Sequence, residues 1–371
     1  MKIALVHDYL REYGGAERVL EAIHNLYPDA PVYVGFIDWK SLGIHAHRFR
    51  NWQIKETWIC RLPLHKKLYS PYRIFAPKAF EALDLSDFDV VISSSNAYFA
   101  KSVRVPNGKH VCYCHTPPRA LYGYSTMSNW KASPLTLVIG SIMNHFLRII
   151  DYYAAQRVDS FIANSRETAR RIEKFYRRES TVIYPPVALA DLFAPEKDQL
   201  IPLLDRTYYL YVNRLALAKH PEIAVAVCTK LNLPLKVVGE GKMLAGLKEM
   251  AGPTVEFLGG VDDAQLCQLY AGAQALLYPV EDEDFGIVPV EAMAFGTPVI
   301  AHNSGGPRET VIQGKTGVLF DDLTEAGLHA ALQQFAKLSF SPTAIQQHAK
   351  QFSSKAFATR IRKLVATAIG G

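Results

Sequence analysis

The sequence predicts an α/β protein of two domains, each built on a doubly wound parallel sheet. Short apolar runs rich in β-branched residues alternate with longer amphipathic segments along the whole chain. Such runs are typical of parallel strands that helices cover on both faces, because both sides of each strand are then buried. The length of 371 residues suits about two domains. The 49 % share of hydrophobic residues supplies material for two cores.

Eleven apolar runs are predicted to be strands. Five lie in the first half of the chain: Ile3–Val6, Val32–Phe36, Val90–Ser93, His110–Cys114 and Phe161–Asn164. Six lie in the second half: Tyr208–Val212, Leu235–Gly239, Val255–Leu258, Ala275–Tyr278, Pro298–Ala301 and Val318–Phe320. The segments between them, such as Ala16–Leu26 after the first run, are predicted to form the covering helices.

A proline-rich stretch separates the two halves. Tyr184–Pro186 ends one strand, and two more prolines lie in the polar residues that follow, up to residue 206. Proline clusters stop helices and favour extended connectors. We therefore expect a first domain at residues 1–190 and a second at 191–352. The amphipathic residues 353–371, with no strand after them, predict a C-terminal helix.

Charge is distributed unevenly between the halves. Residues 1–190 hold 25 lysines and arginines against 16 aspartates and glutamates, a net charge of +9, whereas residues 191–371 carry −3. The basic first half is expected to meet an anionic partner. No recognised nucleic-acid-binding module accompanies the charge, so nucleic acid is not an expected partner. The high apolar content and the overall charge of +6 exclude a mainly disordered chain.

Neither a membrane span nor a disulfide framework is expected. The longest uncharged run, Ala132–Leu147, is shorter than the roughly 20 apolar residues of a spanning helix and contains several polar residues. A strand-like run begins at the second residue, so no signal peptide is expected. Five cysteines are an odd number, as suits buried thiols of a cytosolic chain. These features predict a cytoplasmic protein whose membrane contact, if any, is peripheral.

The most informative segment, Glu283–Pro298, follows a predicted strand and begins a predicted helix near Gly286. Backbone N–H groups at such a helix start bind anions, and a glycine lets a phosphate approach closely. Glu283 and Glu291 are eight positions apart, about two helical turns, so both carboxylates are expected to face one cleft and bind hydroxyl groups. For the glutamates alone, a surface helix with an acidic first turn is the alternative.

A pair of cations follows the first strand of the second half. Arg214 and Lys219 are five positions apart, directly after Tyr208–Val212. Arginine and lysine at the end of a strand can clamp a diphosphate. Solvated loop charge is the alternative.

Two glycine turns are weaker candidates for phosphate or sugar contacts. Gly239–Gly241 and Gly305–Gly306 each stand between a predicted strand and a helix. Ordinary turn glycines are the alternative. Leu244 occupies the place of the third glycine in a dinucleotide fingerprint, so a nicotinamide site is not supported.

The first half offers a glycine pair and a histidine. Gly14 and Gly15 follow the first predicted strand and precede a helix, so a ligand can lie against their backbone. His115 follows the strand His110–Cys114, at the sheet edge where α/β proteins bind ligands. A structural histidine is the alternative.

Metal binding is not expected in the first half. Cys112 and Cys114 are alternate residues of one strand without a partner pair, so they do not predict zinc. Asp87 and Asp89 resemble the acidic pair that holds a metal in one class of sugar transferases. However, Asp89 precedes a predicted strand, at the end of the sheet away from ligands.

The segment Lys55–Lys78 is basic and aromatic. It holds six basic residues, one acidic residue and four large aromatic side chains, Trp58, Tyr69, Tyr72 and Phe75. An anionic membrane surface or an anionic acceptor is the functional interpretation, and a solvated loop with aromatic anchors is the alternative.

Taken together, these residues resemble the retaining GT-B glycosyltransferases of family four, the group 1 family. The resemblance covers essentially the whole chain, and its most specific part is Glu283–Pro298 with the cation pair ahead of it. It implies two Rossmann-like domains facing a cleft, a donor held mostly by the second domain, and a final helix, 353–371, that crosses back to the first. The tract Arg61–Tyr69 with Cys114–Arg119 resembles members that build bacterial surface polysaccharides.

The resemblance also implies roles for single residues. The implied catalytic residues are His115 near the reacting carbon, Arg214 and Lys219 on the donor diphosphate, and Glu283 on hydroxyls of the donor sugar. The further implied donor-binding residues are Gly14 and Gly15 at the phosphates, Gly239, Leu258 at the base, Phe285, Gly286, Ile287 and Val288 beside the sugar, and Glu291 at the ribose. The chain departs from the family pattern at Asn213 and Asp284, where glycine is usual.

The expected function is therefore retaining, metal-independent hexosyl transfer from a nucleotide sugar to a polysaccharide or lipid-linked oligosaccharide, with no cofactor. UDP-glucose is the first expectation for the donor and GDP-mannose the second. The alternative is a non-catalytic nucleotide-sugar-binding subunit of a polysaccharide-assembly complex. An enzyme that uses NAD is disfavoured by the missing glycine.

Overall fold

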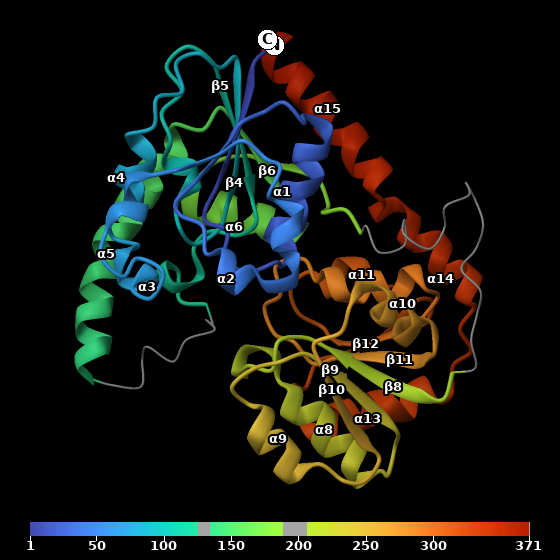
Figure 1. Cartoon of the computed structure of the whole chain (residues 1–371). Coiled ribbons are helices and arrows are strands. Elements are labelled where there is room, and N and C mark those ends of the chain that lie inside the picture. Colours follow the sequence, from blue (N-terminus) through green and yellow to red (C-terminus); the bar gives the residue numbers. More distant parts are fainter. Residues whose placement is uncertain (125–133, 188–205, 371) are drawn as a thin grey trace. The chain divides into compact units, whose positions relative to one another are not determined.

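The apolar runs form two parallel sheets, one in each of two units of the computed structural model (Figure 1). The structure describes residues 1–124, 134–187 and 206–370. The N-terminal unit contains Met1–Pro186 and Phe357–Gly371, and the C-terminal unit contains Val187–Ala356.

The N-terminal unit has a seven-stranded parallel sheet with the order β3-β2-β1-β4-β5-β6-β7. The strand order reverses between β1 and β4, and ligands of open α/β sheets bind at the carboxyl ends of the strands flanking such a point. The strands are β1 (Ile3–His7), β2 (Val32–Val34), β3 (Ile54–Glu56), β4 (Val90–Ser95), β5 (Lys109–Cys114), β6 (Ser160–Ala163) and β7 (Thr181–Val182).

Helices cover both faces of this sheet. Successive residues of β1 are buried on opposite faces of the sheet. Leu5 packs with residues of α1, whereas Ala4 and Val6 pack with residues of α4 and α5. The strand is apolar throughout because helices cover both faces of the sheet. The helices are α1 (Gly15–Leu26), α2 (Trp39–Leu42), α3 (Tyr69–Tyr72), α4 (Ala76–Glu81), α5 (Pro134–Gln156) and α6 (Arg166–Tyr176).

The last helix, α15 (Ser354–Gly370), packs on the N-terminal sheet. Phe357, Ile361 and Val365 recur every four residues, so they share one face of the helix, and all three are buried. The ring of Phe357 lies 6.1 Å from that of Tyr113 on β5. The end of the chain therefore completes the core of the unit that its beginning forms.

The C-terminal unit has a six-stranded parallel sheet with the order β10-β9-β8-β11-β12-β13, and its order reverses between β8 and β11. The strands are β8 (Tyr208–Val212), β9 (Leu235–Val238), β10 (Val255–Gly259), β11 (Ala273–Tyr278), β12 (Val299–His302) and β13 (Gly317–Phe320). The helices are α8 (Pro221–Lys230), α9 (Leu244–Met250), α10 (Asp263–Ala271), α11 (Ile287–Ala294), α12 (Pro307–Thr310), α13 (Glu325–Phe335) and α14 (Pro342–Ala349).

All eleven predicted strands are present, with ends that differ by at most two residues. The sequence interpretation missed β3, which lies at the start of the basic segment Lys55–Lys78. Its side chains are exposed or only half-buried, because it is the edge strand of the sheet, so it lacks the apolar pattern of the others. The interpretation gave no bounds for the helix α5, whose uncharged run was considered only as a membrane span.

Candidate functional site

The candidate site of the C-terminal unit lies at the switch point between β8 and β11. Asn213 and Arg214 follow β8 directly, and the loop that carries Glu283 joins β11 to α11. Both segments thus leave the carboxyl edge of the sheet from neighbouring strands. This is the place where a doubly wound sheet binds ligands. The predicted cation pair and the predicted segment that starts at Glu283 both lie there.

Lys219 and Glu283 form an ion pair between their Nζ and Oε2 atoms. Each side chain is mostly buried, with 18 % and 16 % of its surface exposed. A second partner of Glu283 is Tyr278, the last residue of β11, whose hydroxyl also contacts Asn213. Burial, together with the charge of Glu283, raises the pKa of Tyr278 well above its ordinary value, so the phenol stays protonated and can donate to the carboxylate. The Glu283 carboxylate is therefore fixed from two sides.

Glycines set the shape of both loops. A Cβ at Gly305 would lie 2.1 Å from the carbonyl oxygen of Glu283, and one at Gly306 would lie 2.0 Å from that of Phe285. Gly239 has a φ of +130°, and its Cβ would lie 1.9 Å from the carbonyl oxygen of Asn213. Because these residues have no Cβ, the backbones of neighbouring loops can pack closely. This is a structural role, and it supports the ordinary-turn alternative for Gly305 and Gly306.

The helix α11 begins after Gly286, which has a φ of +81° and no side chain to cap the first turn. The N–H groups of Ile287 and Val288 belong to this first turn, where a helix attracts anions. The ring of Phe285 is buried and lies 5.7 Å from that of Phe352, so the ring packs inward. The backbone of 285–288, rather than its side chains, is what this segment offers a ligand.

Glu283 and Glu291 do not share a helix. Because α11 starts at Ile287, Glu283 stands in the preceding loop, and the expected two-turn spacing along one helix is wrong. Glu291 is 2 % exposed and accepts a hydrogen bond of 2.9 Å from the hydroxyl of Tyr270. Leu258 lies near the carboxyl end of β10 and is half-buried.

The N-terminal unit contains a buried chain of polar side chains at its own switch point. His115 Nε2 lies 2.8 Å from Ser94 Oγ, and Ser94 Oγ lies 3.0 Å from His7 Nδ1. His7 Nε2 lies 3.5 Å from Glu17 Oε1. The other oxygen of Glu17 accepts a hydrogen bond of 2.8 Å from the backbone N–H of Gly14. Strands β1 and β4, the end of β5 and the start of α1 supply these groups.

The chain of contacts keeps Glu17 charged and His115 neutral. Burial alone would raise the pKa of Glu17, but the hydrogen bond and charge of His7 and the N–H of Gly14 outweigh it and lower that pKa. Burial, followed by the neighbouring His7, lowers the pKa of His115 to about 3. A neutral ring with Nε2 fixed by Ser94 presents only Nδ1 to other partners. Among the described residues, nothing hydrogen-bonds to that nitrogen.

Gly14 and Gly15 lie where the sequence places them. Gly14 is the residue before the first turn of α1, and Gly15 begins the helix and is exposed. Glu17, which accepts the hydrogen bond from Gly14, connects this turn to His115 through contacts with His7 and Ser94. The sequence interpretation missed these three positioning residues. The polar run Ser93–Ser95 at the end of an otherwise apolar strand was the signal that could have found one of them.

The described residues contain no group of three or more potential metal ligands. Cys112 and Cys114 are buried thiols. Asp89 accepts a hydrogen bond of 2.7 Å from the backbone N–H of Lys2, just before β4 begins. It lies at the amino edge of the sheet, as the sequence predicts.

Acid should destabilise the N-terminal unit because of its buried histidines. Burial lowers the pKa of His110 to about 4 and that of His115 to about 3, from an ordinary 6.5. Below pH 6.5 the unfolded chain binds protons that the folded chain does not, so each histidine should remove about 1.4 kcal/mol of unfolding free energy per pH unit. Urea unfolding at pH 7 and pH 5 measures this loss. H110Q should lose less than wild type, whereas the exposed control H47Q should match it; equal stability at both pH values contradicts the assignment.

Two family models match the chain. The model described as "Glycosyl transferases group 1" matches residues 195–358, and "Glycosyltransferase Family 4" matches residues 13–191. The two matches run almost end to end and leave only the chain ends and a three-residue gap. The chain belongs to the group 1 glycosyltransferases.

Curated relatives of this glycosyltransferase are similar over part of their length. The mouse protein "Alpha-1,3/1,6-mannosyltransferase ALG2" is 28 % identical over 291 residues, which cover 68 % of the chain and 66 % of that protein. The "GDP-mannose-dependent alpha-mannosyltransferase" of Mycolicibacterium smegmatis is 39 % identical over 123 residues, which cover 33 % of the chain and 32 % of that protein. The chain thus spans 66 % or less of the length of these relatives.

Solved structures share the fold over the whole glycosyltransferase chain. Sucrose-phosphate synthase from Thermosynechococcus elongatus matches with a TM-score of 0.70 and 19 % identity, covering all of both chains. HepE of Anabaena in complex with UDP-glucose matches with a TM-score of 0.68 and 19 % identity, covering 99 % of this chain and all of that one. The two Rossmann-like sheets are those of the GT-B fold, as the sequence predicts.

Proposed function

We propose that this glycosyltransferase moves a hexose from a nucleoside diphosphate sugar to a polysaccharide or lipid-linked oligosaccharide, with retention of the anomeric configuration. The observation that carries the proposal is the convergence, at one switch point, of two cations, an uncapped helix start and a fixed carboxylate. Arg214 and Lys219 supply the cations, the turn at Gly286 supplies the helix start, and Glu283 supplies the carboxylate.

Each group suits one part of the donor. The diphosphate gains negative charge as the bond from the sugar carbon to its oxygen breaks, and cations held in place stabilise that charge without reorganising. The first turn of α11 adds backbone N–H groups for the same phosphates. Glu283 accepts hydrogen bonds from sugar hydroxyls, and Glu291 accepts them from the ribose. Tyr278 holds Glu283 in place when Lys219 turns to the phosphate.

His115 orients the sugar and does not serve as a base in this proposal. A ring whose pKa is near 3 is a weak proton acceptor at neutral pH. The proton of the attacking acceptor hydroxyl therefore passes to the departing diphosphate oxygen, which lies on the same face of the sugar when the configuration is retained. Nδ1 of His115 contacts a sugar hydroxyl, and Gly14 and Gly15 adjoin the phosphates.

For the donor we propose GDP-mannose, ahead of UDP-glucose. The sequence expectation had the opposite order and rested on how common UDP-hexoses are. The relatives named as a GDP-mannose-dependent mannosyltransferase and as a mannosyltransferase support the change. The neighbour that holds UDP-glucose supports the second candidate through its fold alone.

For the acceptor we propose a lipid-linked sugar reached at the inner face of an anionic cell membrane. Residues 1–190 supply the net charge of +9 that favours such a surface. Among the described residues, no helix is both long and apolar enough to cross a membrane, so the contact in this proposal is peripheral. The non-catalytic alternative, a binding subunit, has no observation in its favour, because all four proposed catalytic residues are present.

Donor binding without a metal is the direct test of this proposal. The midpoint temperature of thermal denaturation should rise with GDP-mannose or UDP-glucose in EDTA, because Arg214 and Lys219 neutralise the diphosphate and the donor binds without a metal. Adding Mg²⁺ or Mn²⁺ should not enlarge the shift, and NAD should give none. A shift that appears only with a metal ion contradicts metal independence. A shift with NAD alone contradicts the donor class.

A further inference from the structure

Helix α5 buries two polar side chains and exposes many large apolar ones. Its buried side is formed by Asn144, Leu147, Asp151, Ala154 and Ala155, of which Asn144 and Asp151 are polar. The amide of Asn144 accepts from Arg73 Nη2 at 3.3 Å and donates to the carbonyl of Ala120. An ordinary surface helix turns its apolar stripe toward the core, whereas most large apolar side chains of α5 are exposed.

Asp151 is the more buried of the two polar residues. Its carboxylate pairs with Lys101, and the two side chains are 0 % and 1 % exposed. It also accepts a hydrogen bond of 2.9 Å from the hydroxyl of Tyr122. The ion pair with Lys101 therefore holds the buried side of the helix in place. Asp151 is the one acidic residue of α5, so the exposed side of the helix has no negative charge.

The outer side of α5 exposes large apolar side chains. The described residues include 20 exposed large hydrophobic side chains, and nine of them lie on this helix. They are Leu137, Val138, Ile139, Ile142, Phe146, Ile149, Ile150, Tyr152 and Tyr153. A contiguous apolar patch of this kind marks an interaction surface rather than ordinary surface variation.

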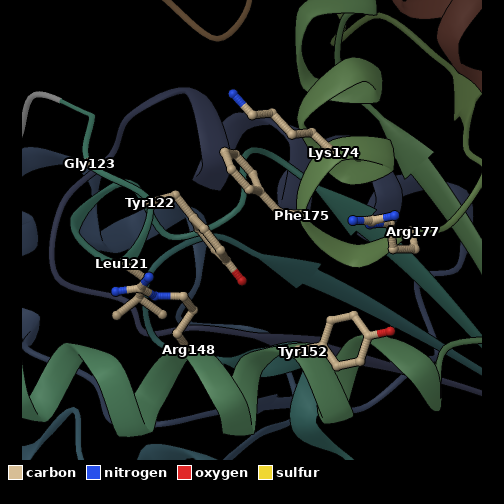
Figure 2. A pocket seen from close by; sticks show the side chains of 8 residues that line it. All are labelled: Leu121, Tyr122, Gly123, Arg148, Tyr152, Lys174, Phe175 and Arg177. Carbon is tan, nitrogen blue, oxygen red and sulfur yellow. The ribbon is translucent and has the colours of Figure 1, made fainter.

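A cationic hollow adjoins this apolar side. Arg148 and Tyr152, one turn apart on α5, line a cavity of about 770 Å³ together with Lys174 and Arg177 at the end of α6 (Figure 2). The rings of Tyr122 and Phe175 stack 4.1 Å apart in the same wall. None of the eight lining residues is acidic.

Three cations lie in this hollow. Neither Arg148, Lys174 nor Arg177 forms an ion pair with any residue in the described ranges. Unpaired cations beside an apolar face are complementary to a surface of anionic headgroups over hydrocarbon. A second copy of the chain is a poorer occupant, because a two-fold axis through this face would bring like charges together.

The basic segment Lys55–Lys78, which a hydrogen bond from Arg73 to Asn144 connects to α5, is itself rich in exposed apolar and basic side chains. Leu64, Leu68, Ile74 and Phe75 are exposed large hydrophobic side chains of this segment. Lys66 and Lys67 between them are exposed as well. Arg73, in contrast, is half-buried on Asn144 of α5, so it fastens the segment to the helix and is not free to meet a headgroup.

We propose that α5 is the membrane-docking helix of the N-terminal unit. Its apolar side lies among the lipid chains at the surface of an anionic bilayer, and the hollow between α5 and α6 holds the phosphate of a lipid headgroup. The proposal names the surface for the membrane contact proposed above, but it does not depend on glycosyl transfer or on the donor.

Vesicle flotation with the full chain tests the proposal. The wild type should float with vesicles of phosphatidylcholine and phosphatidylglycerol, and less with phosphatidylcholine alone. I142E/F146E should lower the bound fraction at least tenfold on both, because charge on the apolar side opposes insertion. R148E/K174E should remove the preference for the anionic vesicles. K337E/L338E, which changes an exposed cation and an exposed apolar residue of the C-terminal unit, is the matched control and should bind like wild type.

Two further readouts separate the possible failures. Donor-induced thermal shifts should be unchanged in the α5 variants, which shows that they fold and that the donor site is independent. Binding of I142E/F146E equal to wild type, or no binding of wild type even at low salt, overturns the proposal. So does a wild-type dimer in sedimentation equilibrium that I142E/F146E dissociates, since a second copy would then be the occupant.

Discussion

Replacing Arg214 or Lys219 by alanine should lower kcat/KM by about 30- to 1,000-fold. Each cation is proposed to neutralise charge that develops on the leaving diphosphate, and loss of one such contact costs about 2–4 kcal/mol in the transition state. The fold should survive, because Arg214 is exposed and Lys219 ends a short 3-10 helix, Leu217–Lys219, outside the hydrophobic core. Steady-state kinetics with saturating acceptor measure the loss.

The two cations should differ in one respect. Lys219 is paired with Glu283, so K219A leaves that carboxylate with one partner fewer and should also weaken binding of the sugar. Arg214 follows β8 and is exposed, so R214A should act mainly on nucleoside diphosphate binding. K315A removes an exposed cation just before β13, at the opposite edge of the sheet, and should behave as wild type. Near-normal turnover in both R214A and K219A contradicts the clamp.

Glu283→Gln should lower kcat by about 100-fold or more, an effect of roughly 3 kcal/mol, while the nucleotide alone still binds normally. The substitution keeps the shape of the side chain but removes the charge that receives sugar hydroxyls and attracts Lys219. Competition between donor and nucleoside diphosphate separates the two effects, since only the donor carries the sugar.

Its controls lie in the same loop and on the neighbouring strand. E281Q removes an exposed carboxylate two positions earlier and should leave kcat unchanged. Y278F removes the hydroxyl that contacts Glu283 and should give a smaller loss than E283Q, because it loosens the carboxylate without removing it. A normal kcat for E283Q, or a loss shared equally by E281Q, would refute the role of Glu283.

The strands could be predicted because their sequence signal is local. Ile3–His7 or Ala273–Tyr278 is apolar on both sides, which a parallel central strand requires wherever it stands in the sheet. The edge strand β3 has no such requirement. Helix α5 was missed because pattern reasoning assumes that large apolar residues face the core, whereas most of those on α5 are exposed and the polar Asn144 and Asp151 are buried.

In the candidate site, too, some residues could be predicted from the sequence and others could not. Arg214, Glu283 and His115 lie in the segments that follow β8, β11 and β5, so their place at a carboxyl edge could be inferred from the order of elements alone. The partners of Ser94 and Tyr278 could not be inferred in this way. Ser94 contacts His7 and His115, and Tyr278 contacts Asn213, across strands that are distant in sequence. Such pairings depend on sheet order, which the sequence does not state residue by residue.

The central claim is retaining, metal-independent transfer from a nucleoside diphosphate hexose, and donor turnover observed by proton NMR tests it most directly. The protein is incubated in EDTA with GDP-mannose or UDP-glucose, without an acceptor, so that water slowly takes the sugar. We expect one donor to be consumed, the first sugar released to be the α-anomer, and R214A to release almost none. Release of the β-anomer first, or consumption of neither donor by a folded protein that binds nucleotide, would contradict the account.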